Sequence, residues 1–236
     1  MAPASPRRRP APRAPSPRAL ARARRAFFGT RSRFVATLKR VGSVRISVRY
    51  RRFRWITAIV LLLVLVQIAT GILLSLYYNP GPTSAYTSTR FFVTHVPLGW
   101  LMRSVHAWAA DLLLGAVLLH LALVFFRGAY SRPREYVWML GVCLLLVILA
   151  LRFTGRVLPW DEVAYATARD GLAMIADVPI VGGLTAVWLR GGVQVGVNTL
   201  SRFFTTHVMI LPWLGLVIFS LHAYLVRGHG LAEEKR

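Results

Sequence analysis

The stretch Arg103–His120, RSVHAWAADLLLGAVLLH, carries two histidines fourteen residues apart in an otherwise apolar run. Fourteen steps of an α-helix turn by about 1400°, within roughly 40° of whole turns, and rise by about 21 Å. His106 and His120 therefore share one helix face, and each lies near one edge of a bilayer core that is about 30 Å thick. Either histidine alone would predict only a packed or hydrogen-bonded side chain.

A second pair, His207 and His222, lies fifteen residues apart in the apolar run FTTHVMILPWLGLVIFSLHAYLV. This spacing turns by about 1500°, within roughly 60° of whole turns, and rises by about 22 Å. Placed antiparallel, the two helices offer one histidine pair at each membrane face. The pattern is the one expected for bis-histidine ligation of two stacked haems.

Composition indicates an integral membrane protein, because 56% of the 236 residues are hydrophobic and the mean hydropathy is +0.52. Four apolar segments are long enough to span a bilayer, at about 55–78, 107–126, 136–153 and 204–226. The polar stretches between them contain too many Gly and Pro residues to cross lipid. The sequence therefore predicts an all-α fold, a transmembrane four-helix bundle that binds two haems between facing helices.

The net charge of +22 predicts the orientation of the chain. Of 30 Lys and Arg residues, 17 precede the first segment, three fall in 127–134 and three follow the last segment. The positive-inside rule places both termini and the 127–134 loop in the cytoplasm. His106 and His207 then form the outer pair, and His120 and His222 the inner pair.

The chain divides into three parts: a basic tail at 1–54, a four-helix domain at 55–230 and a short tail at 231–236. Residues 1–25 are mostly Arg, Pro, Ala and Ser and predict disorder, and 26–54 mix apolar and basic residues as a membrane-surface helix does. The tail lacks the apolar region of a secretory signal, and a transit peptide stays an alternative. We expect membrane lipid, and no nucleic acid, as its partner.

Four single residues carry weaker expectations. Cys143, the only cysteine, excludes a disulfide within the chain and a C-x-x-C-H haem attachment, and it is expected to lie in the core. Asp111 is costly in lipid and is expected to make a polar contact in the bundle or at a dimer interface. His95 is expected to be a loop residue and no ligand. Pro212 is expected to bend the fourth segment.

Glycines repeat the histidine spacing. Gly141 and Gly155 in the third segment are also fourteen residues apart. Glycine at this spacing leaves room beside each haem plane, although close packing of helices would also select it. The first segment has Gly71 at its outer end, but Thr57 stands fourteen residues earlier. We therefore expect the inner haem to be a little more crowded on that side or to accept a hydroxyl contact.

The connection at about 154–203 is the longest, and long loops in compact proteins are usually functional. It begins with the run Pro159–Glu162. Asp161 and Glu162 could accept protons from a substrate on the outer face, and a solvated acidic loop is the plainer alternative.

Together, the motifs WLMRSVHAW, FTGRVLPWDE, VPIVGG and LRGGVQVGVNTLSRFFTTH and the two histidine pairs resemble the cytochrome b/b6 family. The resemblance covers about 55–230. The family forms the haem-bearing core of quinol–cytochrome c and quinol–plastocyanin oxidoreductases. The fifteen-residue spacing, the PWD motif and the four-helix length resemble the b6 branch.

The resemblance implies roles for the matching positions. His106 and His207 would hold an outer, low-potential haem, and the inner pair a high-potential haem. The other matches are Arg103 and Arg202 at haem propionates, Gly71, Gly141 and Gly155 beside the haems, Arg227 near the inner haem and inner quinone site, and Pro159, Trp160, Asp161 and Glu162 at the wall of the outer quinol site.

Three positions depart from the family pattern. Trp55 stands where the b6 branch has the cysteine of a third haem, so we expect no covalent haem. Arg156 replaces a tyrosine and Ala166 a tryptophan beside the outer quinol site. The Pro-Glu-Trp-Tyr motif belongs to the family's C-terminal half, which a separate subunit-IV-like protein would supply.

The prediction is a di-haem cytochrome b subunit, with two non-covalent haem b groups, of a quinol-oxidising bc/b6f-like complex. Its partners would be a Rieske-type iron–sulfur protein, cytochrome c or a similar acceptor and, by resemblance, a second copy. The excess of 28 Arg over 2 Lys favours a bacterial cytoplasmic (inner) membrane. Two alternatives stay open: the anchor of a hydrogenase- or formate-dehydrogenase-like enzyme, and a haem-free scaffold.

Overall fold

The computed structural model describes residues 51–132 and 134–229, and every regular element in this part is a helix. Three spans are single helices, namely α2 (Arg51–Tyr77), α4 (Gly99–Phe126) and α5 (Glu135–Val157). The fourth is continuous from α8 (Val197–Thr205) through a π-helical turn, η2 (Thr206–Ile210), into α9 (Leu211–His229). All four are long and apolar enough to cross a membrane, as predicted. The expected tail structure at 1–50 and 231–236 lies outside the described residues.

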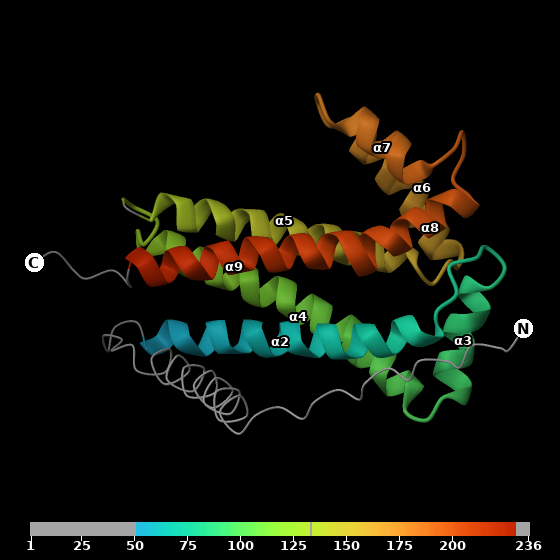
Figure 1. The fold of residues 1–236 in the computed structure, drawn as a ribbon, viewed down its shortest axis with the longest axis horizontal. Coiled ribbons are helices and arrows are strands. Elements are labelled where there is room, and N and C mark those ends of the chain that lie inside the picture. The colour runs from blue at the N-terminus through green and yellow to red at the C-terminus, as the bar shows by residue number, and fades with distance from the viewer. Residues whose placement is uncertain (1–50, 133, 230–236) are drawn as a thin grey trace, which may run out of the picture. The chain divides into compact units, whose positions relative to one another are not determined.

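The spans pack as two pairs, α2 against α4 and α5 against α9, and α4 also contacts α5 (Figure 1). Within each pair the helices run in opposite directions. The histidine-bearing helices α4 and α9 therefore run parallel, so the predicted antiparallel placement is wrong. The reason is topological, because one complete crossing, α5, lies between them and restores the direction of the chain.

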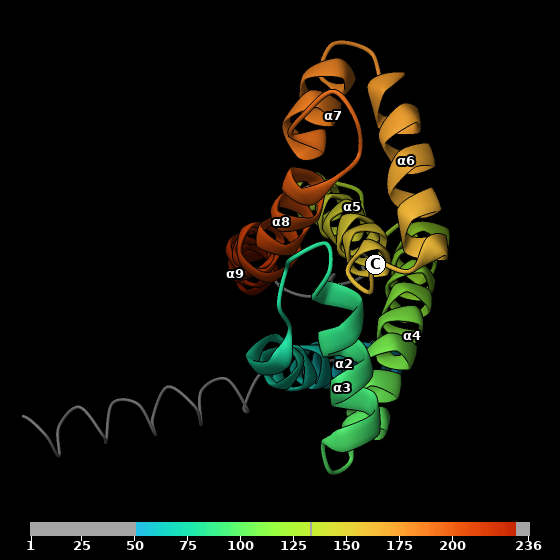
Figure 2. The ribbon, with the colours of Figure 1, turned by 90° about the vertical axis from the view of Figure 1, so that its right-hand side faces the viewer.

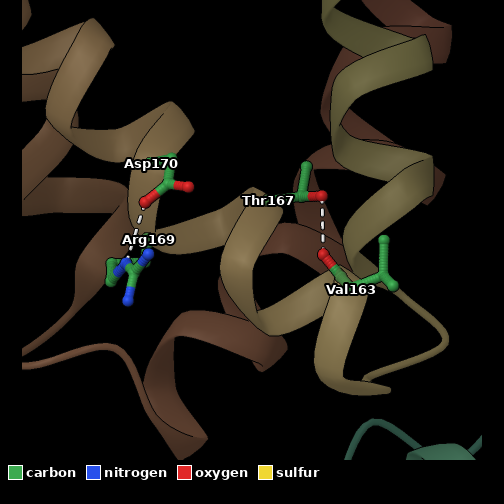
Figure 3. A network of polar contacts seen from close by, with 4 residues as sticks. All are labelled: Val163, Thr167, Arg169 and Asp170. Atoms are coloured by element: carbon green, nitrogen blue, oxygen red, sulfur yellow. Dashed lines mark hydrogen bonds and ion pairs between the residues drawn. The ribbon is translucent and has the colours of Figure 1, made fainter.

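Three short helices gather at the end of the bundle where α2 and α5 finish. The helix α3 (Ala85–His95) lies across this end and packs on α4, while α6 (Glu162–Ala176) and α7 (Gly182–Arg190) form a hairpin that projects from it (Figure 2). In the hairpin, Thr167 donates to the Val163 carbonyl and Arg169 pairs with Asp170 (Figure 3).

A water-excluding core holds this end together. Its buried members come from α5, α6, α7 and α8, and are Val157, Ala168, Leu172, Ala186, Leu189 and Phe203. Tyr78, just beyond α2, donates its hydroxyl to the Leu158 carbonyl at 2.7 Å and stacks on Phe204. Burial raises the pKa of Tyr78, so the phenol keeps its proton and stays a donor. Along the four spans, many large apolar side chains are exposed, as expected for helices surrounded by lipid.

The π-helical turn lies directly before Pro212, where the sequence predicts a bend. The Leu211 N–H donates to the Thr206 carbonyl, five residues back. A π-turn holds one residue more than an α-helical turn. The fifteen residues from His207 to His222 therefore cover the same rotation as the fourteen from His106 to His120. This removes the difference between the two histidine spacings.

Two single-residue expectations have opposite outcomes. Asp111 makes the predicted polar contact, because its Oδ1 accepts from Arg152 Nε of α5 at 2.5 Å. Cys143, in contrast, is exposed on α5, so its expected core position is wrong. The lipid-facing side of a membrane helix is as apolar as the core, so composition alone does not tell whether a residue faces the lipid or the core.

We expect Asp111→Asn to lower the free energy of unfolding by about 2 kcal/mol, between the values typical of exposed and buried ion pairs. The change leaves the Arg152 guanidinium, whose side chain is 27% exposed, without its carboxylate inside a membrane span. Thermal unfolding followed by circular dichroism measures the effect.

The matched control is Asp170→Asn, which breaks a pair whose side chains are 65% and 63% exposed and which lies outside the spans. Asp170→Asn should lower the free energy of unfolding by less than about 1 kcal/mol. The double variant Asp111→Asn/Arg152→Met should recover most of the loss. Equal costs for the two single variants would contradict the prediction.

Candidate functional site

The outer histidines meet across the bundle. His106 of α4 and His207 of η2 have ring centroids 6.5 Å apart, with the ring planes at 73°. They are held from two helices that belong to different packed pairs. The structure thus brings together the two outer residues that the positive-inside rule assigned to one membrane face.

A threonine hydroxyl contacts each outer imidazole. Thr70 Oγ1 lies 2.8 Å from His106 Nδ1, and Thr154 Oγ1 lies 3.0 Å from His207 Nδ1. Each hydroxyl already donates its single proton to the carbonyl four residues back, at 2.6 Å and 2.8 Å. With the hydroxyl proton on that carbonyl, the threonine oxygen can accept from an Nδ1–H, and Leu151 is a further backbone partner of His207. This tautomer leaves the Nε2 lone pair of each ring free to bind a metal.

Glycines lie against the same two rings. A Cβ at Gly71 would stand 3.3 Å from His106 Cε1, and a Cβ at Gly155 would stand 2.8 Å from His207 Cε1. The nearest atoms from other parts of the described chain are those of the histidines, and no atom of a neighbouring helix backbone is among them. The glycines thus let each imidazole approach a neighbouring helix, and their space-making role beside a haem stays a prediction.

The inner histidines, His120 on α4 and His222 on α9, lie near enough to each other for their charges to interact. Gly141 of α5 lies beside this pair, because an added Cβ would stand 3.8 Å from His222 Cε1 and 3.1 Å from Leu121 Cδ2. The same helix α5 thus places one glycine beside each histidine pair.

The donor set fits a metal group that brings ligands of its own. Residues 51–132 and 134–229 hold no group of three or more His, Cys, Asp or Glu that could bind a bare metal ion. Each histidine pair offers two imidazoles, and the outer rings lie 6.5 Å apart. His106 with His207, and His120 with His222, would therefore hold a haem, which supplies the remaining iron ligands itself.

At the outer end, Arg103, Pro159 and Asp161 line one cavity of about 210 Å³ together with residues of α3. Trp160 has a positive φ of 53° and turns the chain into α6. Asp161 Oδ1 accepts from the Ala164 N–H at 2.8 Å, so part of this carboxylate serves as the helix cap. A role in proton transfer for Asp161 and its neighbour Glu162 stays a prediction.

Other expected site residues lie apart from this cavity. Arg202 donates to the Trp188 carbonyl, and its guanidinium carbon lies 6.0 Å from the centre of the Trp188 ring, at the end of α7. Arg227 lies near the inner end of α9. Arg156 is exposed on α5. His95, which was expected in a loop and not as a ligand, is instead the last residue of helix α3, where its ring stacks on Phe91.

Sequence reasoning missed the two hydroxyls and one arginine. Thr70 and Thr154 each precede a site glycine, so a repeated Thr-Gly pair in two apolar segments was the available signal. Arg90 lines the outer cavity and belongs to a stripe of α3 with helical spacing.

We expect Thr154→Val to weaken binding of a metal group at the outer pair by about 10-fold, because the His207 imidazole loses its hydroxyl partner and keeps only the backbone of Leu151. Cofactor retention during graded dilution, followed by absorbance, measures this. Thr94→Val is the control, since Thr94 Oγ1 contacts His95 Nδ1 at 2.7 Å outside the site. Equal retention in both variants would refute the positioning role.

Comparisons with known proteins agree with this geometry. The family model Cytochrome b/b6/petB matches residues 42–230. Cytochrome b6 of Prochlorococcus marinus strain NATL1A is 37% identical over 180 residues, which cover 76% of this chain and 83% of that protein. Cytochrome b6 of strain MIT 9303 is 35% identical over 206 residues, which cover 87% and 94%.

A solved structure titled Hyperthermophilic respiratory Complex III is also similar. It superposes with a TM-score of 0.67 at 30% identity, covering 77% of this chain and 50% of the matched chain. This chain therefore spans half the length of its counterpart there. The four-helix fold, the parallel histidine-bearing helices and the match over most of the sequence lead to one conclusion: the chain is a multi-pass membrane protein of the cytochrome b/b6 family.

Proposed function

We propose that the protein is the di-haem b-type cytochrome subunit of a quinol-oxidising bc/b6f-like complex. The observation that carries the proposal is the outer histidine pair, with rings 6.5 Å apart and each Nδ1 within 3.0 Å of a threonine oxygen. The inner pair would provide a second site about 21 Å along α4, with Gly141 beside His222. Two such sites in line suit electron transfer from one membrane face to the other.

The chain's own residues would bind, orient and insulate the cofactors. His106 and His207 would ligate one haem b and His120 and His222 the other, without covalent attachment. When bound, haem supplies one-electron iron chemistry, whose potential depends on ligands, hydrogen bonds and burial. The threonine oxygens hold the Nδ1 protons in place. The surrounding apolar side chains exclude water.

The outer end would provide the quinol-oxidation site. Pro159, Trp160, Asp161 and Glu162 would form one wall of that site, and a subunit-IV-like protein would supply the other half. One electron would leave to a Rieske-type protein and onward to cytochrome c or a similar acceptor. The second would pass through the outer and inner haems to quinone near Arg227. Arg156 and Ala166 would set the fit of the quinol.

The charge distribution supports both termini in the cytoplasm, and the excess of Arg over Lys supports a bacterial cytoplasmic membrane. Family resemblance alone supports a dimeric complex. Membership of the cytochrome b/b6 family gives no support to a hydrogenase- or formate-dehydrogenase-like anchor. A haem-free scaffold is the alternative that experiment must separate.

The test is a pyridine haemochrome assay on the purified chain, with protein quantified in the same sample. We expect two extractable b haems per chain, both reduced when quinol is added to the assembled complex. One haem would refute one histidine pair. None in a folded preparation would overturn the proposal and leave the scaffold.

A further inference from the structure

One stripe of α3 faces the outer cavity. Tyr86, Thr89, Arg90 and Val93 line it, and their spacing of three, four and seven residues is that of a single helix face. Arg103, in the first turns of α4, lines it as well. The cavity has a volume of about 210 Å³. Two guanidinium groups from two different helices thus border one small space.

The cavity lies about one helical turn outside the outer histidine pair. Arg103 precedes His106 by three residues, a rise of about 4.5 Å along α4. On the opposite side, Pro159 follows shortly after Gly155, which lies against His207. A group held between the two histidines would have its outward edge directed toward this cavity.

The charges at the cavity suit an anion. Arg90 and Arg103 contribute two positive charges against the one negative charge of Asp161, whose Oδ1 also caps α6. Arg202, the other arginine expected at a propionate, is engaged at the end of α7 by the Trp188 carbonyl. Guanidinium forks bind carboxylates in pairs of hydrogen bonds, and haem carries two propionate carboxylates.

We propose that Arg90, together with Arg103, binds the propionates of the outer haem and raises the reduction potential of that haem. The inference rests on the proposed haem at His106 and His207. Reduction adds one negative charge, which a nearby cation stabilises, and the stabilisation is larger next to an apolar bundle than in water. α3 would then be part of the cofactor site as well as a connection.

The test is an anaerobic redox titration of the haem-loaded chain carrying Arg90→Gln. We expect the outer haem to become about tenfold easier to oxidise, which is 59 mV for one electron. The inner haem, about 21 Å away along α4, should keep its potential and serve as the internal reference. Arg90→Lys keeps the positive charge and should shift the redox equilibrium of the outer haem by less than about threefold.

The control is Arg169→Gln, which removes an exposed guanidinium of α6 that does not line the cavity. A reduction potential of the outer haem that falls in Arg90→Gln and not in Arg169→Gln supports the inference. Loss of the outer haem alone in Arg90→Gln, with both haems kept in Arg90→Lys, supports it as well. Two haems with an unchanged outer potential in Arg90→Gln, or an equal shift in Arg169→Gln, overturn it while the proposed function stands. Absence of haem from the unaltered chain refutes both.

Discussion

His207→Ala should reduce the haem content from two to one per chain, and the remaining haem should have the potential of the inner site. The substitution removes one of the two protein nitrogens at the outer pair, and no other His, Cys, Asp or Glu in the described chain completes a three-ligand group that could replace it. Haem-to-protein ratio and redox titration of the same sample measure the loss.

Two further variants make the result specific. His222→Ala should also leave one haem, but with the potential of the outer site. His95→Ala should keep both, because this imidazole stacks on Phe91 of α3, outside both pairs. Full haem content in His207→Ala, or one and the same remaining potential in both single-haem variants, would contradict the assignment of two separate bis-histidine sites.

Gly155→Leu should have an effect of similar size, with selective loss of the outer haem. A Cβ at Gly155 would already lie 2.8 Å from His207 Cε1, closer than carbon atoms in proteins approach. The rest of a leucine side chain would occupy the space beside the imidazole that the cofactor requires. We expect one haem per chain, with the inner site unchanged, in the same haem and redox measurements.

The matched control is Gly115→Leu in α4, since a Cβ added there meets no atom within 4 Å in the described structure. Gly141→Ala should be milder than Gly155→Leu, because its nearest neighbour is the flexible end of Leu121, at 3.1 Å. Equal haem content in Gly155→Leu and Gly115→Leu would show that the glycine only serves helix packing.

Local sequence patterns predicted the four spans because helix periodicity and bilayer thickness act within single segments. The same reasoning placed two histidines at each membrane level, and the family motifs identified the cytochrome b/b6 family, which the comparisons confirm. The direction of the fourth span relative to the second was predicted wrongly, although the number of crossings between them determines it. A polar contact of Asp111 was expected, but its partner Arg152 is 41 residues away, beyond any local pattern.

The sequence by itself determined how far along each helix the functional side chains lie. Only the tertiary structure decided how the helices are rotated about their axes, and this rotation sets which side chains meet. It turned Thr70 and Thr154 toward the histidines and Cys143 outward. It also placed the Arg90 face of α3 over the outer cavity. The physical reason is that an apolar helix in lipid has no polar face to orient it, so packing against its neighbours selects the rotation.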